Sequence, residues 1–257
     1  MSLARTALRL AVVEALATHP VIADQCPGRV YDSRVGDFDN REPVPVIVVT
    51  TEELSGEPVN IQNGGGPWFD ACDLVLEIAM SQVVDVDGEP CIGRPVTDRE
   101  LEAALDLIEE CAECIITLGR PTPRSRPTRA GQVLTQAVTR RVSKRTSSRF
   151  SSDDTGEKLA IHLLTFRVEL KGEDIDFRAL PTGTFAVLPD PLRTVAESLT
   201  EGSSGYLTCR MIADQLALTV APTPKLSRAT IAVPSDPAQQ VPGTLPVNLT
   251  VDFPQEP

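Results

Sequence analysis

The sequence has few of the side chains from which most catalytic sites are built. It contains two histidines, His19 and His162, with one tryptophan, two tyrosines and seven phenylalanines. Histidine is the most frequent general acid or base, yet His19 precedes a proline at a predicted helix end and His162 lies on a predicted strand. The segment Gly202-Ser203-Ser204-Gly205 is one residue short of a serine nucleophile turn. We therefore expect no catalytic residue and no enzymatic activity.

Motifs for metals and phosphates are also incomplete. Cys111-Ala112-Glu113-Cys114 has the CxxC spacing of a zinc site, but it lies within a predicted helix and no second CxxC exists. Asp85-Val86-Asp87-Gly88 begins like a calcium loop without the later acids, and the glycine run 64–66 lacks the lysine of a phosphate-binding loop. These segments predict buried thiols, a turn and a flexible loop, with no metal ion and no cofactor.

Long apolar runs are absent as well. Arg9 and Glu14 interrupt the apolar N-terminal segment, and no stretch approaches the ~18 uninterrupted apolar residues of a membrane span. We expect a soluble chain made in the cytoplasm, with its six cysteines reduced.

Acidic residues are missing from one tract, residues 120–150, although the net charge of the chain is −12. That tract carries nine arginines and lysines, whereas residues 1–119 carry 22 acidic and 7 basic residues. Three interpretations are open for the tract: an interface with a neighbouring subunit, a solvated surface, and contact with DNA. The interface interpretation explains both the basic tract and the excess of acidic residues that precedes it. The residues predicted to form it are Arg120, Arg124, Arg140, Arg141, Lys144 and Arg145, opposite Glu102, Asp106, Glu109 and Glu113.

Two long helices are predicted in the first half of the chain. Ser2 can cap a helix over residues 3–17, and the narrow polar face of this helix implies burial on more than one side. Thr97 and Glu100 form a capping box that begins a helix over residues 98–118. The apolar stripe of this second helix is Leu101, Ala104, Leu105, Ile108, Cys111, Ala112 and Ile115, and its outer face is acidic.

Strand patterns surround the second helix. Alternating or β-branched residues predict strands at residues 29–32, 43–51, 74–80, 140–150 and 158–170. The last two should form a long hairpin, and residues 52–67 should form a loop. Residues 132–142 fit a short helix as well as a strand, and both interpretations stay open.

The composition changes after residue 173. We predict a short helix after Pro191, a second over residues 204–216, and strands at residues 229–233 and 247–253 between proline-rich segments. The predicted domains are therefore residues 1–173 and a C-terminal extension of residues 174–257, either a small module or a wrapping arm.

The order of these elements, together with two local segments, resembles a known family. The segments are RVYDSRVGDFDNREPVPVIVV from Arg29 and GEKLAIHLLTFRVEL from Gly156. With the leading helix they resemble the tail terminator, or tail completion, proteins of long-tailed bacteriophages over roughly residues 1–173. The resemblance implies an α+β fold, in which a mixed, largely antiparallel sheet carries two helices on one face. Here a C-terminal α/β extension follows.

Tail terminators are structural virion proteins, so the resemblance implies assembly rather than chemistry. The expected assembly is a homohexameric ring that caps the tail tube and joins it to a head-side connector or stopper protein at the neck. DNA would pass through the lumen without specific binding, and no membrane would be involved. The expected location is the virion, after assembly in the host cytoplasm. Contact with the tube protein is expected from the loop 53–67 and the hairpin 140–170, and the residues named for it are Gly64, Gly65, Gly66 and Trp68.

Two other classes remain open. Another head–tail connector or a head-completion protein would share the size and the ring. A small hydrolase or metal-binding domain would differ in metal content and in the reactivity of its thiols.

Overall fold

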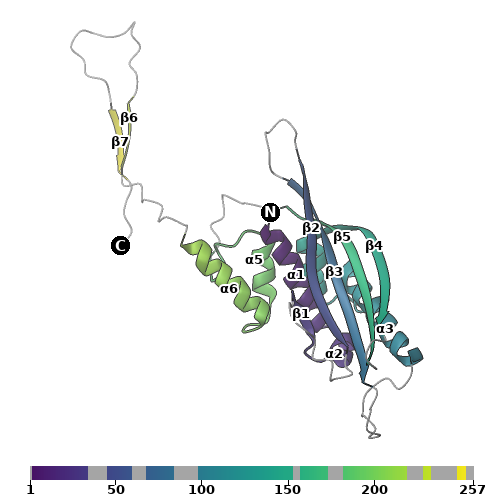
Figure 1. The fold of residues 1–257 in the computed structure, drawn as a ribbon. Helices are drawn as coiled ribbons and strands as arrows, with labels where there is room; N and C mark the ends of the chain where they lie inside the picture. Colours follow the sequence, from purple (N-terminus) through teal and green to yellow (C-terminus); the bar gives the residue numbers. More distant parts are fainter. Residues whose placement is uncertain are drawn as a thin grey trace, which may run out of the picture. The chain divides into compact units, whose positions relative to one another are not determined.

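The computed structural model describes residues 2–33, 45–59, 68–83, 98–152, 157–172, 182–218, 228–232 and 248–252. The chain forms two compact units, residues 1–216 and residues 217–257. In the smaller unit, β6 (Arg228–Ala232) and β7 (Asn248–Asp252) pair as an antiparallel hairpin (Figure 1). These two strands were predicted from their alternating pattern, and the prediction is confirmed.

The larger unit is built on a five-stranded sheet with the order β1-β2-β3-β5-β4 (Figure 1). In the described part of the chain β1 and β2 run parallel, and the other neighbouring pairs run antiparallel. The predicted α+β class with a mixed, largely antiparallel sheet is therefore confirmed. The strands are β1 (Val30–Asp32), β2 (Val46–Pro58), β3 (Trp68–Val83), β4 (Thr139–Ser152) and β5 (Glu157–Leu170).

One face of the sheet forms the core. Successive side chains of a strand point to opposite faces, so alternate positions of β3 and β5 lie on the same side. The two strands pair in register, with Leu76 opposite Leu164 and Leu74 opposite Phe166. All of the core-side positions predicted from the period-two pattern are buried, namely Leu74, Leu76, Ile78, Met80, Leu164, Phe166, Val168 and Leu170.

Two helices cover this core face, α1 (Ser2–Ala17) and α3 (Asp98–Leu118). Figure 1 shows both of them behind the strands. In α3 the predicted stripe is confirmed, since Leu105, Ile108 and Ile115 have no exposed surface. Helix α1 is buried nearly all round because it contacts the sheet on one side and other helices elsewhere. Its Arg9 forms an ion pair with Asp32 at the end of β1.

The segment between α1 and β1 contains a helix that the sequence did not predict, α2 (Pro20–Gln25). Proline ends one helix but is also favoured at the first position of another, where its missing N–H costs nothing. The buried side chain of His19 caps α2: its Nδ1 accepts from the N–H groups of Val21 and Ile22 at 3.2 and 3.3 Å. Its Nε2 lies 3.0 Å from the carbonyl oxygen of Pro121. His19 therefore has a structural role.

The structure after α3 decides between helix and strand for residues 132–142. Helix α4 (Arg129–Gln132), capped by the side chain of Thr128, continues as the π-helical turn η2 (Val133–Val138). Strand β4 begins directly after it, at Thr139. The segment is thus helical through Val138 and strand beyond. Residues 120–125 form bends and a turn.

The predicted loop over residues 52–67 is wrong in its first half. Strand β2 continues to Pro58, because its backbone pairs with β3 as far as the Pro58–Trp68 position. A bulge between Thr51 and Leu54 keeps Leu54 on the core face despite the polar residues around it. The glycines 64–66, the capping residue Thr97, and the turns at residues 87–88 and 153–156 lie outside the described residues.

The larger unit continues beyond the predicted boundary at residue 173. Helix α5 (Leu192–Ser198) contacts α1 and η2, and its Leu192, Val195 and Ala196 are buried in the same core. Helix α6 (Ser204–Ala217) adds Cys209 and Ala213 to that core. The compact unit therefore ends at Leu216 rather than at residue 173. No helix among the described residues is long and apolar enough to cross a membrane.

Candidate functional site: two polar surfaces of the sheet

Charged side chains collect in two places, one on each face of the sheet. The first is a seam where α3 meets β4 and β5. Acidic residues of α3 at intervals of three and four point toward these strands. Arg145 and Arg149 of β4 face them from the core side of the sheet, where they are paired in register with Phe166 and His162 of β5. Arg145 pairs with Glu113, and Arg149 pairs with Glu102. We call this set the α3 seam: Glu102, Glu109, Glu113, Arg145, Arg149 and His162.

His162 is the buried member of the α3 seam, 5% exposed. Its Nδ1 lies 3.0 Å from Oε2 of Glu109, and its Nε2 lies 3.8 Å from Oε2 of Glu102. Among the described residues, Nε2 of His162 is a buried side-chain nitrogen without a hydrogen-bond partner. Two carboxylates therefore flank one imidazole in a partly shielded position.

The α3 seam bears on the predicted subunit interface. Glu113 and Arg145, placed there as partners between neighbouring subunits, pair within one chain, and Glu102 pairs with Arg149 of the same chain. Asp106, Arg120 and Arg124 are exposed. A neighbour could still engage these residues, as well as the exposed Arg140 and Lys144, and the interface itself stays a prediction.

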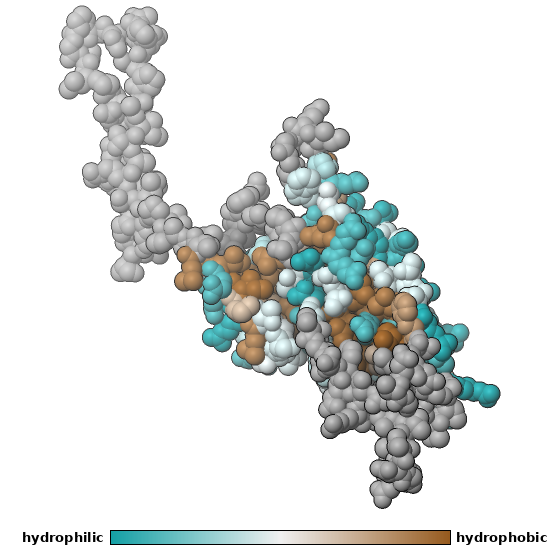
Figure 2. All heavy atoms as spheres, viewed as in Figure 1, coloured by the Kyte–Doolittle hydropathy of each residue, from teal (hydrophilic) through white to brown (hydrophobic). Residues whose placement is uncertain are grey.

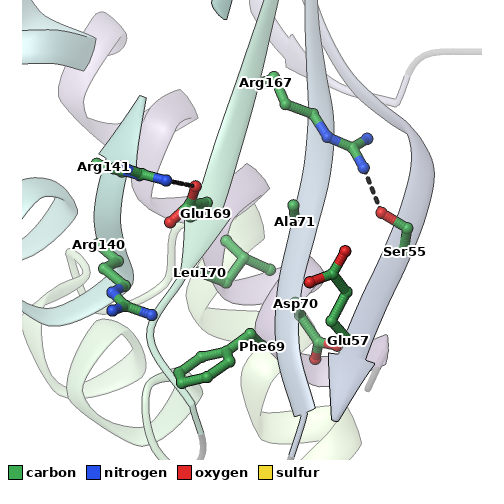
Figure 3. A pocket seen from close by; sticks show the side chains of 10 residues that line it. All are labelled: Ser55, Glu57, Phe69, Asp70, Ala71, Arg140, Arg141, Arg167, Glu169 and Leu170. Atoms are coloured by element: carbon green, nitrogen blue, oxygen red, sulfur yellow. Dashed lines mark hydrogen bonds and ion pairs between the residues drawn. The ribbon is translucent and has the colours of Figure 1, made fainter. Parts of the chain in front are cut away.

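The second surface is a groove on the opposite face of the sheet, which we call the open-face groove (Figure 3). It has a volume of about 620 Å³. Its residues come from the ends of four strands, β2, β3, β4 and β5. The lining consists of Ser55, Glu57, Phe69, Asp70, Ala71, Arg140, Arg141, Arg167, Glu169 and Leu170.

Ion pairs fix the arginines along the open-face groove. Arg141 donates from Nε to Glu169 at 2.7 Å, and this hydrogen bond lowers the pKa of the Glu169 carboxyl. Arg167 reaches Asp73 at 3.0 Å and also donates to Ser55 (Figure 3 shows the second contact). The guanidinium of Arg140 lies 4.8 Å from the centre of the Phe69 ring, a cation–π distance.

One aromatic side chain, Phe69, lines this groove at the start of β3, whereas its neighbour Trp68 points to the other face of the strand. Trp68 is 40% exposed and Phe69 is 48% exposed, although both types usually bury most of their surface. Of the residues predicted to touch the tail tube, Trp68 is the one that the structure describes. Figure 2 shows that hydrophilic residues gather over the upper part of the strands and hydrophobic ones lie below them.

Cysteines contribute no reactive group to either surface in the described part of the chain. Burial raises the pKa of the Cys26 thiol to about 12, and those of Cys72 and Cys209 to about 11. Burial also raises the pKa of Cys111 and Cys114 in α3. All five are free thiols, so they behave as small apolar side chains.

No family model matches the chain, and no curated protein matches it significantly. The arguments about function therefore rest on the two surfaces described above.

Sequence reasoning identified most of the charged residues but did not place them. Arg140, Arg141 and Lys144 lie on or beside the open face, whereas Arg145 and Arg149 lie on the core side. His162 and Phe69 were not singled out as site residues. The signal for His162 was available, because it occupies a core-side position of β5 in the same alternation as Leu164 and Phe166.

Proposed function

We propose that this chain is a structural assembly subunit that docks through the open face of its sheet. In its specific form, the proposal is a tail terminator of a long-tailed bacteriophage, whose ring caps the tail tube and meets the head-side connector. The element order of the first 173 residues supports the specific form, and the arrangement of the sheet supports the general one.

The observation that carries the proposal is the open-face groove itself. The helices α1 and α3 pack against the other face, where the core lies. The groove is lined by the exposed ring of Phe69 and by three arginines. Tryptophan, tyrosine and arginine dominate the residues that contribute most to protein–protein binding, because they combine large area with directed polar contacts.

The two surfaces suggest a division of roles. Phe69 and Arg140 form the contact with the tube protein, because they lie together and are exposed. Exposed Arg120 and Arg124, in the segment after α3, serve the contact between neighbouring subunits. Each subunit of a closed ring needs two different patches, because one patch contacts the other patch of the next subunit.

The test begins with electron microscopy of the purified chain. A tail terminator forms rings of a single order that bind the ends of purified tail tubes. A ring that binds the head-side connector but not the tube would identify a head-completion protein instead. A monomer at all concentrations, with no binding to tubes, would reject the proposal.

Substitution then tests the docking surface. The change of Phe69 and Arg140 to alanine should leave rings intact and weaken tube binding about 30-fold, equivalent to about 2 kcal/mol. Leu207→Ala is the matched control, since Leu207 is an exposed apolar side chain on α6, 54% exposed and remote in sequence. Equal tube binding by all three proteins would show that docking uses another surface.

A further inference from the structure

The α3 seam contains a buried polar atom that the described chain leaves without a partner. Nε2 of His162 is buried, makes no hydrogen bond, and points toward Glu102 at 3.8 Å, beyond hydrogen-bond range. A buried nitrogen without a partner loses its hydration and gains nothing in return. The tautomer of the ring, set by what binds Nδ1, therefore decides whether Nε2 can donate toward Glu102.

Carboxylates surround this imidazole. Oxygen atoms of Asp106 and Glu109 and a ring nitrogen of His162 lie within 4.8 Å of one another. Glu102 adds a third carboxylate near the opposite nitrogen. Each ring nitrogen of His162 thus faces a glutamate, with Nδ1 at Glu109 and Nε2 at Glu102.

The acidic charge in this cluster is not balanced by the side chains around it. Arg149 pairs with Glu102, and Arg145 pairs with Glu113. Among the described residues Asp106 has no cationic partner, and Glu109 has only His162. Like charges held this close repel each other, and a cation between them would relieve the repulsion.

We propose that Asp106, Glu109 and His162 bind a divalent transition-metal ion, with Glu102 as the nearby carboxylate that orients the imidazole. In known sites, a metal-bound histidine donates its other N–H to a carboxylate, which fixes the ring and its tautomer. The seam offers this arrangement, because an ion held by Nδ1 beside Glu109 leaves the ring proton on Nε2, which faces Glu102. The ion would join α3 to β5.

The donor set selects the ion. Imidazole favours zinc and other transition metals, whereas carboxylates also suit manganese, so one histidine with two carboxylates fits Zn²⁺ or Mn²⁺ better than Ca²⁺. Bonds of about 2.1 Å would bring the ligand atoms closer together than they are now. Asp106 is exposed and can turn its side chain to close that gap.

The experiment uses the full-length chain and Mn²⁺ alone, measured by electron paramagnetic resonance and calorimetry. Manganese avoids the thiols of α3, because thiolates prefer softer ions and burial raises the pKa of Cys111 and Cys114. We expect one ion per chain and a rise in Tm when the ion is added, since a ligand that binds only the folded state stabilises it. Zn²⁺ should compete for the same site.

Two substitutions and a control decide the assignment. Asp106→Asn and His162→Gln should each weaken Mn²⁺ binding at least 10-fold, and Asp106→Asn, at an exposed position, should leave the fold intact. Glu110→Gln is the control, because Glu110 lies on the same helix with an exposed side chain outside the cluster. Absence of bound Mn²⁺ and Zn²⁺, or equal affinity in the wild type and Asp106→Asn, would overturn the proposal. These readouts do not depend on ring formation, so the site and the proposed function can fail separately.

Discussion

At the scale of single residues, two glycines let two backbone segments pack directly against each other. Gly119 ends α3 with φ of +65°, and Gly131 lies in α4 directly against it. A Cβ built on Gly131 would lie 2.2 Å from the carbonyl oxygen of Gly119, which is backbone and has little freedom to move. The two glycines therefore allow the end of α3 and the start of α4 to touch, and the backbone N–H of Thr128 also donates to Gly119 at 3.1 Å.

The first prediction concerns this contact. Gly131→Ala should lower the free energy of unfolding by about 1–3 kcal/mol, because the clash outweighs the roughly 1 kcal/mol that alanine gains in a helix. The measurement is urea unfolding followed by circular dichroism. Gly172→Ala is the control, since no atom lies within 4 Å of the position its Cβ would take. If both variants unfold at the wild-type midpoint, the two backbones are farther apart than described.

At the scale of elements, strand β4 divides one basic tract between two environments. Its bulges, between Thr139 and Arg141 and between Val142 and Lys144, change the phase of the alternation. Arg141 and Lys144 consequently face the open side, opposite Glu169 and Arg167, while Arg145 turns to α3. A run of like charges in the sequence thus serves two surfaces.

The second prediction tests one pairing of the α3 seam. A double-mutant cycle with Glu113→Gln and Arg145→Gln should give a coupling of about 0.2–1 kcal/mol, because the side chains are 31% and 44% exposed and water screens the pair. The coupling should shrink in 1 M salt, where the Debye length falls to about 3 Å. Lys144→Gln is the matched control on the same strand, and its cycle with Glu113→Gln should show no coupling. A coupling of equal size in both cycles would mean that the seam is not specific to Arg145.

At the scale of the whole molecule, residues 1–216 carry a complete core. Its buried members run from Ala4 in α1 to Ala213 in α6. Hydrogen bonds also tie the distant parts of this unit together, including one from Thr200 to Glu14 at 3.2 Å. Burial of this kind is what a domain needs in order to fold independently.

The third prediction follows from that core. A chain ending at Leu218, which keeps α6 whole, should fold cooperatively with a Tm within a few degrees of the full-length value. Differential scanning calorimetry would measure it. A chain ending at Gly172 is the comparison, and it should be strongly destabilised because it lacks α5 and α6. Loss of the cooperative transition in the longer truncation would show that residues 219–257 belong to the core.

Periodic hydrophobic patterns correctly predicted the helices and strands that bury one face. The stripe of α3 and the alternation in β3 and β5 follow from one buried face, so residue type alone located them. The second half of β2 could not be found this way, because Glu52, Glu53 and Gly56 have low strand propensity and owe their conformation to pairing with β3. Helix α2 was missed because Pro20 was interpreted as a stop signal alone.

The candidate sites were less predictable than the fold, for a physical reason. The open-face groove depends on the register of four strands, and the α3 seam joins residues as far apart as Glu109 and His162. The sequence revealed which charges exist and on which helix face they lie. It did not reveal the bulges of β4, which decide which arginine meets which partner.

The position of β5 in the sheet has a consequence for how the protein is made. Strand β3 is paired with β2 on one side and with β5 on the other, but β5 ends at Leu170, long after β3 ends at Val83. At the usual rate of about 5–20 residues per second, a ribosome needs roughly 4–17 s to make the intervening chain. During that time the inner edge of β3 has no strand beside it, and free edges of this kind invite pairing with other chains. Growing chains on one messenger RNA would therefore carry matching open edges until the last strand of each sheet emerges.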